Sequence, residues 1–305
     1  MNVMETCGLG KRYRRNWALR DCSLTVPAGH VVALVGPNGA GKTTLLNLAA
    51  GLLRPTRGQV SVLGGEHPGS AAARSRIGFV SQDAPLYGHL PAGDMLHLAR
   101  NLNLTWDGDR AQARLADLGI PLDRKVRQLS GGQRAQLALT IALAKRPEVL
   151  ILDEPLASLD PLARHDFMGS LMAAVAEDSL SVVFSSHVVS ELERIADYLV
   201  VLNQGRLQLA GEVDALLDTH RILTGPGGEM ALNLKQFAVV QVRQAAAQAH
   251  LLVRTSGVAD PVPAGWLSSP ARLEDLVLAY LRDPQASVLP GPEVTAAAGV
   301  QAVRA

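Results

Sequence analysis

One short glycine-rich segment near the N-terminus has the residue types and spacing to bind a nucleotide phosphate. It reads GPNGAGKTT and matches G-x-x-x-x-G-K followed by Thr, between the apolar stretches HVVALV and TLLNLAAGLL. In this pattern several backbone N–H groups face one point, Lys42 reaches the β- and γ-phosphates, and the Thr43 hydroxyl binds Mg²⁺. The predicted nucleotide-binding residues are Gly36, Pro37, Asn38, Gly39, Ala40, Gly41, Lys42, Thr43 and Thr44.

Two adjacent carboxylates follow a second apolar stretch, VLILD, over residues 149–153. Asp153 ends this stretch, where a protein with a phosphate-binding loop places the carboxylate that holds Mg²⁺. Glu154 comes next and is suited to orient or deprotonate an attacking water, as a general base does. An isolated Asp-Glu pair is more often a solvated helix start. The apolar residues before this pair and the phosphate loop elsewhere in the chain favour the catalytic role.

A second candidate anion site is the segment LSGGQ at residues 129–133. Ser130 and the two glycines after it stand where a helix begins, and apolar residues follow them. Backbone N–H groups point outward at a helix N-terminus and attract an anion. The segment has no lysine and no metal ligand of its own, so these residues alone leave open which molecule carries the anion.

The elements that position these residues indicate an α/β fold over residues 1–212, where short apolar runs alternate with helical patterns and glycine-rich turns. Residues 30–36, 149–153 and 181–187 read as buried parallel strands, because they are almost continuously apolar and rich in β-branched residues. Between residues 83 and 127 the pattern is mostly helical, which predicts a helical subdomain inserted into the core.

The pattern changes after residue 212, and residues 213–283 predict a small appended α+β unit. Residues 221–225 and 250–257 read as strands, and residues 241–249 read as a helix. Residues 284–305 have little periodicity and are expected to form a disordered tail.

A further helix is predicted near the end of this unit, in the segment SSPARLEDLVLAYLR. Ser269 is expected to be its N-cap, with Pro270 at the first helical position. One apolar stripe at helical spacing follows, formed by Leu273, Leu276, Val277, Tyr280 and Leu281.

Bulk composition narrows the function classes. The 305 residues carry a net charge of +1, which gives no broad basic field, so nucleic acid is not an expected partner. The two cysteines, Cys7 and Cys22, form no disulfide framework or metal-ligand cluster and are expected to be reduced thiols. The chain has no signal-peptide pattern and no apolar run of about 18 residues, so a cytoplasmic protein is expected.

Taken together, the motifs resemble those of the ATP-binding subunits of ABC transporters, over residues 1–212. In chain order they are GPNGAGKTT, FVSQ with Gln82, LSGGQ, VLILD with Glu154, ASLD with Asp160 and SSH with His187. The resemblance implies a P-loop NTPase core of the ABC ATPase type, with an antiparallel β subdomain, a helical subdomain and a small C-terminal α+β appendage. It also implies ATP and Mg²⁺ as cofactors and ATP hydrolysis as the activity.

The resemblance gives the second anion site a partner. In this family two ATP-binding subunits pack head to tail and ATP lies at the seam between them, so one chain holds two half-sites. Asp160 would lie at this seam. The segment LSGGQ would contact the γ-phosphate of ATP held by the other subunit, and its nucleotide-binding residues would be Ser130, Gly131, Gly132 and Gln133.

The resemblance also assigns roles to three further side chains. His187 would contact the γ-phosphate and help to fix the catalytic geometry, and Gln82 would approach Mg²⁺ and the attacking water. Tyr13 matches the aromatic position that stacks on adenine, although Trp17 lies nearby and either ring could instead pack on a sheet.

The function implied is that of an energy-coupling subunit, peripheral on the inner face of the cell membrane. Its expected partners are a second, identical ATP-binding subunit and an integral membrane permease on a separate chain. The helical insert after Gln82 and the short C-terminal unit resemble those of exporter ATPases, which favours export. An importer ATPase and a non-transport, regulatory ABC ATPase are the alternatives.

Overall fold

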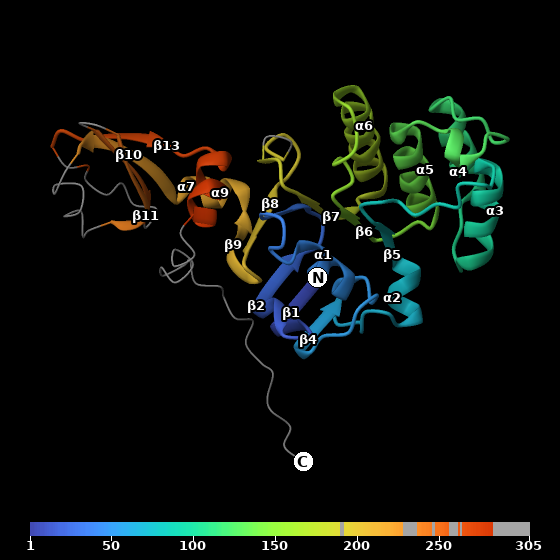
Figure 1. Ribbon diagram of the computed structural model, residues 1–305, viewed down its shortest axis with the longest axis horizontal. Helices are drawn as coiled ribbons and strands as arrows, with labels where there is room; N and C mark the ends of the chain where they lie inside the picture. Colours follow the sequence, from blue (N-terminus) through green and yellow to red (C-terminus); the bar gives the residue numbers. More distant parts are fainter. Residues whose placement is uncertain (190–191, 228–236, 246–247, 256–261, 263, 283–305) are drawn as a thin grey trace, which may run out of the picture. The chain divides into compact units, whose positions relative to one another are not determined.

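The computed structural model describes residues 1–305 except 190–191, 228–236, 246–247, 256–261, 263 and 283–305, so the predicted tail lies outside the described residues. The chain divides into two compact units, Met1–Leu217 and Asp218–Ala305 (Figure 1). This division falls later than the boundary expected after residue 212. The reason is helix α7 (Val213–Asp218), whose buried Leu216 packs back against Gly211 of the preceding strand.

A six-stranded sheet forms the centre of the first unit, in the order β5-β6-β7-β3-β8-β9. The first five strands in this order pair in parallel, and β9 pairs antiparallel with β8. The strands are β3 (Val31–Val35), β5 (Ile77–Val80), β6 (Val149–Asp153), β7 (Ser181–Ser186), β8 (Tyr198–Asn203) and β9 (Arg206–Glu212). Every residue of β3, β6 and β7 is buried, which confirms the three strands predicted from continuous apolar runs.

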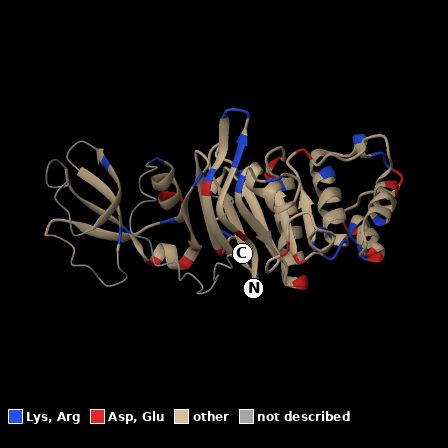
Figure 2. Ribbon diagram, turned by 90° about the horizontal axis from the view of Figure 1, so that it is seen from below, with Lys and Arg blue, Asp and Glu red and all other residues tan. Residues whose placement is uncertain are grey.

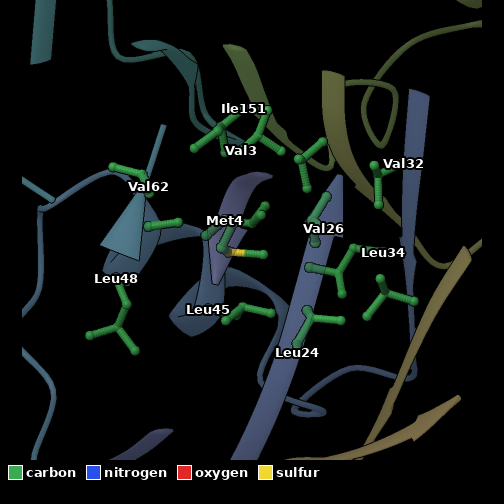
Figure 3. Close-up of a cluster of buried hydrophobic side chains, with 14 of the residues drawn as sticks. Val3, Met4, Leu24, Val26, Val32, Leu34, Leu45, Leu48, Val62 and Ile151 are labelled. Atoms are coloured by element: carbon green, nitrogen blue, oxygen red, sulfur yellow. The ribbon is translucent and has the colours of Figure 1, made fainter. Parts of the chain in front are cut away.

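A second, three-stranded antiparallel sheet in the same unit has the order β2-β1-β4. Its strands are β1 (Asn2–Tyr13), β2 (Asn16–Pro27) and β4 (Arg57–Val62). Helix α1 (Lys42–Ala49) shares one hydrophobic core with this sheet and with β3. In Figure 3 the side chains of Met4, Val26, Leu34 and Leu45, from β1, β2, β3 and α1, lie together in that core. The helix that carries the phosphate loop is therefore fixed by both sheets.

Helices α3 (Ala92–Leu102) and α4 (Gly108–Asp117) form a helical region with its own core. Helix α5 (Gly131–Ala144) also contributes to this core through Leu137, so the helical region extends past the predicted limit at residue 127. Other helices among the described residues of the unit are α2 (Ala71–Arg76), the 3₁₀ turn η1 (Val126–Gln128) and α6 (Pro161–Asp178).

The second unit is a small α+β structure, as predicted. Its antiparallel sheet has the order β11-β12-β10-β13, and helix α9 (Leu273–Arg282) contacts β11 and β12. The strands are β10 (His220–Pro226), β11 (Ala238–Ala245), β12 (Gln248–Arg254) and β13 (Leu267–Pro270). Of the predicted apolar stripe on the helix, Leu281 is half-buried and the other four residues are buried.

Two local predictions for this unit are wrong. The described residues of the segment 241–249 are not helical: residues 241–245 belong to β11 and residues 248–249 to β12, and Val242 pairs with Leu251 and Arg243 with His250. Ser269 and Pro270 do not begin a helix but end the edge strand β13, a position where a proline without an N–H is tolerated.

Two features of the surface and of the helices bear on function. Lys and Arg residues are interspersed with Asp and Glu residues over the ribbon of the first unit (Figure 2). Over the part of the chain that the structure describes, no helix is both long and apolar enough to cross a membrane.

Close packing of Trp266 on Gly225 yields a prediction about the second unit. A Cβ at Gly225 would lie 2.2 Å from the Trp266 indole, which is buried. We expect Gly225→Ala to lower the free energy of unfolding of this unit by about 1–3 kcal/mol, as overpacking does. Urea unfolding followed by tryptophan fluorescence measures this change.

A matched control for that substitution is Gly169→Ala in α6. A Cβ at Gly169 meets no atom within 4 Å, so the alanine should leave stability unchanged or raise it by up to about 1 kcal/mol. Equal unfolding midpoints for Gly225→Ala and the unchanged protein would contradict the predicted packing.

Candidate nucleotide-binding site

The phosphate loop joins the end of β3 to the start of α1, and two of its glycines fix its shape. Gly41 has φ 105°, and a Cβ there would lie 2.5 Å from the backbone oxygen of Ala18. A Cβ at Gly36 would lie 2.3 Å from the backbone oxygen of Leu202. The loop is thus pressed against two neighbouring segments, which only glycine permits. Its other side is open, because Pro37, Asn38 and Gly39 are exposed.

Lys42 lies in the centre of this loop with its ammonium group turned inward. Its Nζ donates a hydrogen bond of 2.7 Å to the backbone oxygen of Gly36 and lies 3.0 Å from Oε1 of Glu154. The Lys42 side chain is 4% exposed and that of Glu154 is 11% exposed. On its other side the Glu154 carboxylate contacts His187, with 3.1 Å between Oε2 and Nδ1. The structure therefore brings the predicted base together with the lysine predicted to bind phosphate and with the predicted histidine.

Asp153 is buried at the end of β6, beside the first turn of α1. Its Oδ1 accepts a hydrogen bond of 3.2 Å from the Thr43 hydroxyl and one of 2.8 Å from Ser185. Its Oδ2 accepts none from the described residues. A carboxylate and a hydroxyl are the hard oxygen ligands that Mg²⁺ prefers, so the Thr43 and Asp153 pair fits the predicted metal. Thr44, next to it, is half-buried and makes no side-chain hydrogen bond to a described residue.

Gln82, the third predicted metal-binding residue, makes no hydrogen bond to that pair. It is exposed in the loop after β5, and β5 lies beside β6 in the sheet. There it lines a hollow of about 580 Å³ together with Pro155 and Ser158, which follow Glu154 in the chain. Gln82 is thus near the carboxylates by topology, without a hydrogen bond to either.

Ser185 is a residue of the site that the sequence analysis missed. Its Oγ accepts a 2.8 Å hydrogen bond from the backbone N–H of Glu154 and donates one of 2.8 Å to Asp153. Glu154 has φ 46°, a left-handed conformation that is uncommon for a residue other than glycine. A signal existed in the sequence, because a serine inside a strand as apolar as SVVFSSH must find a polar partner.

The LSGGQ segment forms the N-terminus of α5, as predicted. Ser130 is the N-cap, and its hydroxyl accepts from the Gln133 N–H at 3.1 Å while the Gln133 side chain accepts from the Ser130 N–H at 3.1 Å. A Cβ at Gly132 would lie 2.8 Å from the Cβ of Ala163 in α6, whose N-cap is Asp160. Glycine at this position therefore lets the two helix starts approach.

These residues form a group apart from the phosphate loop. A surface hollow of about 190 Å³ is lined by Ser130, Gly132, Gln133 and Asp160, and its described lining includes none of residues 36–44. The chain thus presents two separate sets of candidate phosphate contacts, which is the arrangement expected of two half-sites.

The two candidate aromatic rings differ in how open they are. Tyr13 is 46% exposed at the end of β1, with the ammonium of Lys11 5.4 Å from its ring centroid. Trp17 is half-buried, and the guanidinium carbons of Arg12 and Arg57 lie 5.4 and 4.8 Å from its ring. Tyr13 is thus the more accessible ring for a planar ligand.

Comparison with known proteins shows to which family the chain is similar. A family model described as ABC transporter matches residues 19–157. An ABC transporter ATP-binding protein of Nostoc sp. is 33% identical over 78% of this chain and 75% of its own length. The thiamine import ATP-binding protein ThiQ of Shigella flexneri is 33% identical over 69% of this chain and 90% of its own length.

A third relative and a solved structure agree with this family. The Fe(3+) ions import ATP-binding protein FbpC of Pseudomonas fluorescens is 37% identical over 69% of this chain, which spans only 62% of the length of FbpC. The ATP-binding cassette MJ0796, solved as a dimer bound to ADP and Pi, is 26% identical with a TM-score of 0.62. That match covers 69% of this chain and 99% of MJ0796.

The chain belongs to the ATP-binding proteins of ABC transporters. It is therefore an ABC ATPase, in a family whose cassettes bind ATP, dimerise and act with membrane permease subunits.

The Lys42–Glu154 contact leads to a prediction for the nucleotide-free protein. Removing one partner of a buried ion pair leaves an uncompensated charge, which costs about 3–5 kcal/mol. We expect Lys42→Met to lower the free energy of unfolding by an amount in this range. The double variant Lys42→Met, Glu154→Gln should recover part of the loss in the free energy of unfolding. The coupling free energy between the two substitutions should be about 1–3 kcal/mol.

Urea unfolding of the unchanged protein, both single variants and the double variant closes this thermodynamic cycle. Strictly additive effects in the absence of nucleotide would show that the two side chains do not interact.

Proposed function

We propose that this chain binds MgATP at its phosphate loop, hydrolyses it in a head-to-tail dimer with a second copy, and energises import through a separate membrane permease. The observation that carries this proposal is the position of the Glu154 carboxylate. It lies between Lys42 and His187 and directly after Asp153, which is in contact with Thr43.

ATP binding would change the partner of Lys42. The phosphates of ATP carry several negative charges, and the open N–H groups of the loop attract them to the ammonium group. Once Lys42 turns to the β- and γ-phosphates, the Glu154 carboxylate loses its cation. It is then available to accept a proton from the attacking water, as a general base must. The base is therefore released only in a loaded site.

The remaining residues hold the reacting groups in place. Thr43 and Asp153 would hold Mg²⁺, with Gln82 approaching from its loop, and the ion would neutralise charge on the phosphates. His187 would turn from Glu154 toward the γ-phosphate. Tyr13 would stack on adenine, because its ring is exposed and that of Trp17 is enclosed by two arginines.

Closure of the site would need the second copy. The N-terminus of α5, with Ser130, Gly131 and Gln133, would face the γ-phosphate held by the other subunit, with Asp160 beside it at the seam. The Ser130 hydroxyl accepts a bond from Gln133, so its own proton can be donated to a phosphate oxygen. A full set of motifs in one chain supports an identical partner.

The direction of transport is inferred from the relatives. FbpC and ThiQ are named import proteins, and this supports import over the export expected from the helical insert and the C-terminal unit. A permease on a separate chain would place the protein at the inner face of the cell membrane. Interspersed charges and a net charge of +1 support a partner other than nucleic acid.

Glu154→Gln tests the assignment of the base. It should lower ATP turnover by at least about 100-fold, the lower end expected for loss of a general base, while ATP is still bound. With ATP trapped at both seams, the variant should elute as a dimer in size-exclusion chromatography. A monomer at saturating ATP, or turnover near that of the unchanged protein, would reject Glu154 as the base.

A second variant separates the two half-sites. Ser130→Arg places a bulky side chain at the start of α5 and should abolish both hydrolysis and ATP-dependent dimers. ATP binding by the monomer should remain within about 2-fold, because Ser130 is not part of the phosphate loop. Loss of that binding would mean that the LSGGQ segment acts on its own chain's nucleotide.

The transport role is tested by affinity purification from solubilised membranes. Tagged Glu154→Gln protein in excess ATP should bring down a polytopic membrane protein in fixed ratio, identified by mass spectrometry. In vesicles that contain the permease and this chain, transport of the permease's substrate should require ATP on the face of the membrane to which this chain is bound, and should move the substrate toward that face. Recovery of only non-membrane partners would reject the transport role, and ATP-driven efflux would reject import.

A further inference from the structure

Strand β7 carries a hydroxyl at the centre of the candidate site. Ser185 lies between β6 and β3, paired with Asp153 on one side and Leu34 on the other, and it is 0% exposed. Its neighbours in the strand toward the N-terminus are apolar. A buried hydroxyl is costly unless it is hydrogen-bonded, so the identity of its partners matters.

The direction of both hydrogen bonds of Ser185 is fixed by chemistry. The backbone N–H of Glu154 can only donate, so the serine oxygen accepts there, at 2.8 Å. The serine proton is then directed to Oδ1 of Asp153, also at 2.8 Å. One side chain therefore links the candidate metal-binding carboxylate to the backbone of the candidate base.

This link acts at a sharp change in chain direction. Asp153 ends β6 in extended conformation, and Glu154 follows with φ 46°. Such a conformation persists at a site where the surroundings hold it in place. The bond from the Glu154 N–H to Ser185 holds the peptide group between the two carboxylates. This orientation aims the Glu154 side chain at Lys42 and His187.

We propose that Ser185 is a positioning residue for hydrolysis, which acts through Asp153 and Glu154 without touching the nucleotide. It holds Oδ1 of Asp153 beside Thr43 and sets the direction of the Glu154 carboxylate. This inference rests on the proposed function of the same site. It adds one polar group, the Ser185 hydroxyl on β7, to the two carboxylates of Asp153 and Glu154 that already have proposed roles.

Other serines on the strand allow this role to be separated from a purely structural one. Ser181, at the opposite end of β7, is 4% exposed and accepts a 2.9 Å hydrogen bond from the backbone N–H of Gly29. Ser186 bonds the backbone of Val188. Ser181 thus matches Ser185 in residue type, strand, burial and backbone bond, without a contact to either carboxylate residue.

The test compares Ser185→Ala with Ser181→Ala in the full chain. Each loses one buried hydroxyl, and thermal unfolding should show similar losses of stability. Only Ser185→Ala should lower kcat, by about 10- to 100-fold, as loss of a residue that supports a metal ligand does. KM for ATP at saturating Mg²⁺ should change less than about 3-fold, because the phosphate loop is intact.

A binding readout completes the comparison. Affinity for a fluorescent ATP analogue is measured at increasing Mg²⁺ in the Glu154→Gln background, where hydrolysis does not interfere. Adding Ser185→Ala should raise, by about 10-fold or more, the Mg²⁺ concentration that gives half of the Mg²⁺-dependent gain in affinity for the analogue. The affinity for the analogue without Mg²⁺ should be unchanged. Ser185→Thr retains the hydroxyl and should recover most of the lost kcat.

Each outcome distinguishes the proposals. Equal kcat values for Ser185→Ala and Ser181→Ala would overturn the role of Ser185 and leave the ATPase assignment intact. A loss of kcat together with Mg²⁺-free nucleotide affinity would indicate a collapsed site and also overturn it. If the unchanged protein neither binds nor hydrolyses ATP, the proposed function itself fails.

Discussion

Parallel pairing of β3, β6 and β7 is the constraint on which the site depends. Because the three strands run in the same direction, their carboxyl ends meet at one edge of the sheet. The phosphate loop leaves β3 there, the Asp153–Glu154 pair leaves β6, and His187 leaves β7. If the pairing of β6 and β7 shifted by one residue, the Ser185 side chain would lie on the opposite face of the sheet from Asp153. The geometry of the site therefore depends on the strand register.

Burial of Lys42 and Glu154 is the second constraint, because it determines which partners their charged groups need. The Lys42 and Glu154 side chains are both largely buried, so each needs an opposite charge, and the two satisfy each other. Under the proposed function, ATP would compete for the same lysine. Part of the binding energy of the phosphates would then separate this ion pair, and the Glu154 carboxylate would become available as a base only after that exchange. The low dielectric constant around these largely buried side chains would make the proposed coupling between ATP occupancy and reactivity strong.

Sequence reasoning succeeded where the residues themselves determine the structure. The fully buried strands follow from continuous β-branched runs, and the start of α5 follows from Ser130 as an N-cap. It failed where distant partners decide. Residues 241–249 are rich in alanine and glutamine and favour a helix locally, but residues 241–245 lie in β11 and residues 248–249 in β12, and the two strands pair with each other. Pro270 suits a helix start equally well, and its place at a sheet edge depends on β10.

The same distinction applies to the site. The phosphate loop and the carboxylate pair have local patterns, so the sequence identified them, whereas the bond from Ser185 to Asp153 depends on the register between two strands far apart in the chain. The separation in space between the phosphate loop and the start of α5 does not depend on strand register. Both groups belong to regular elements of one chain, the starts of α1 and α5, although only the start of α5 has a side-chain cap, and the described lining of the hollow beside α5 includes none of residues 36–44. Since neither group would have to fold further, the proposed head-to-tail dimer would complete the site by rigid-body association of two chains, with ATP supplying the charge that joins them.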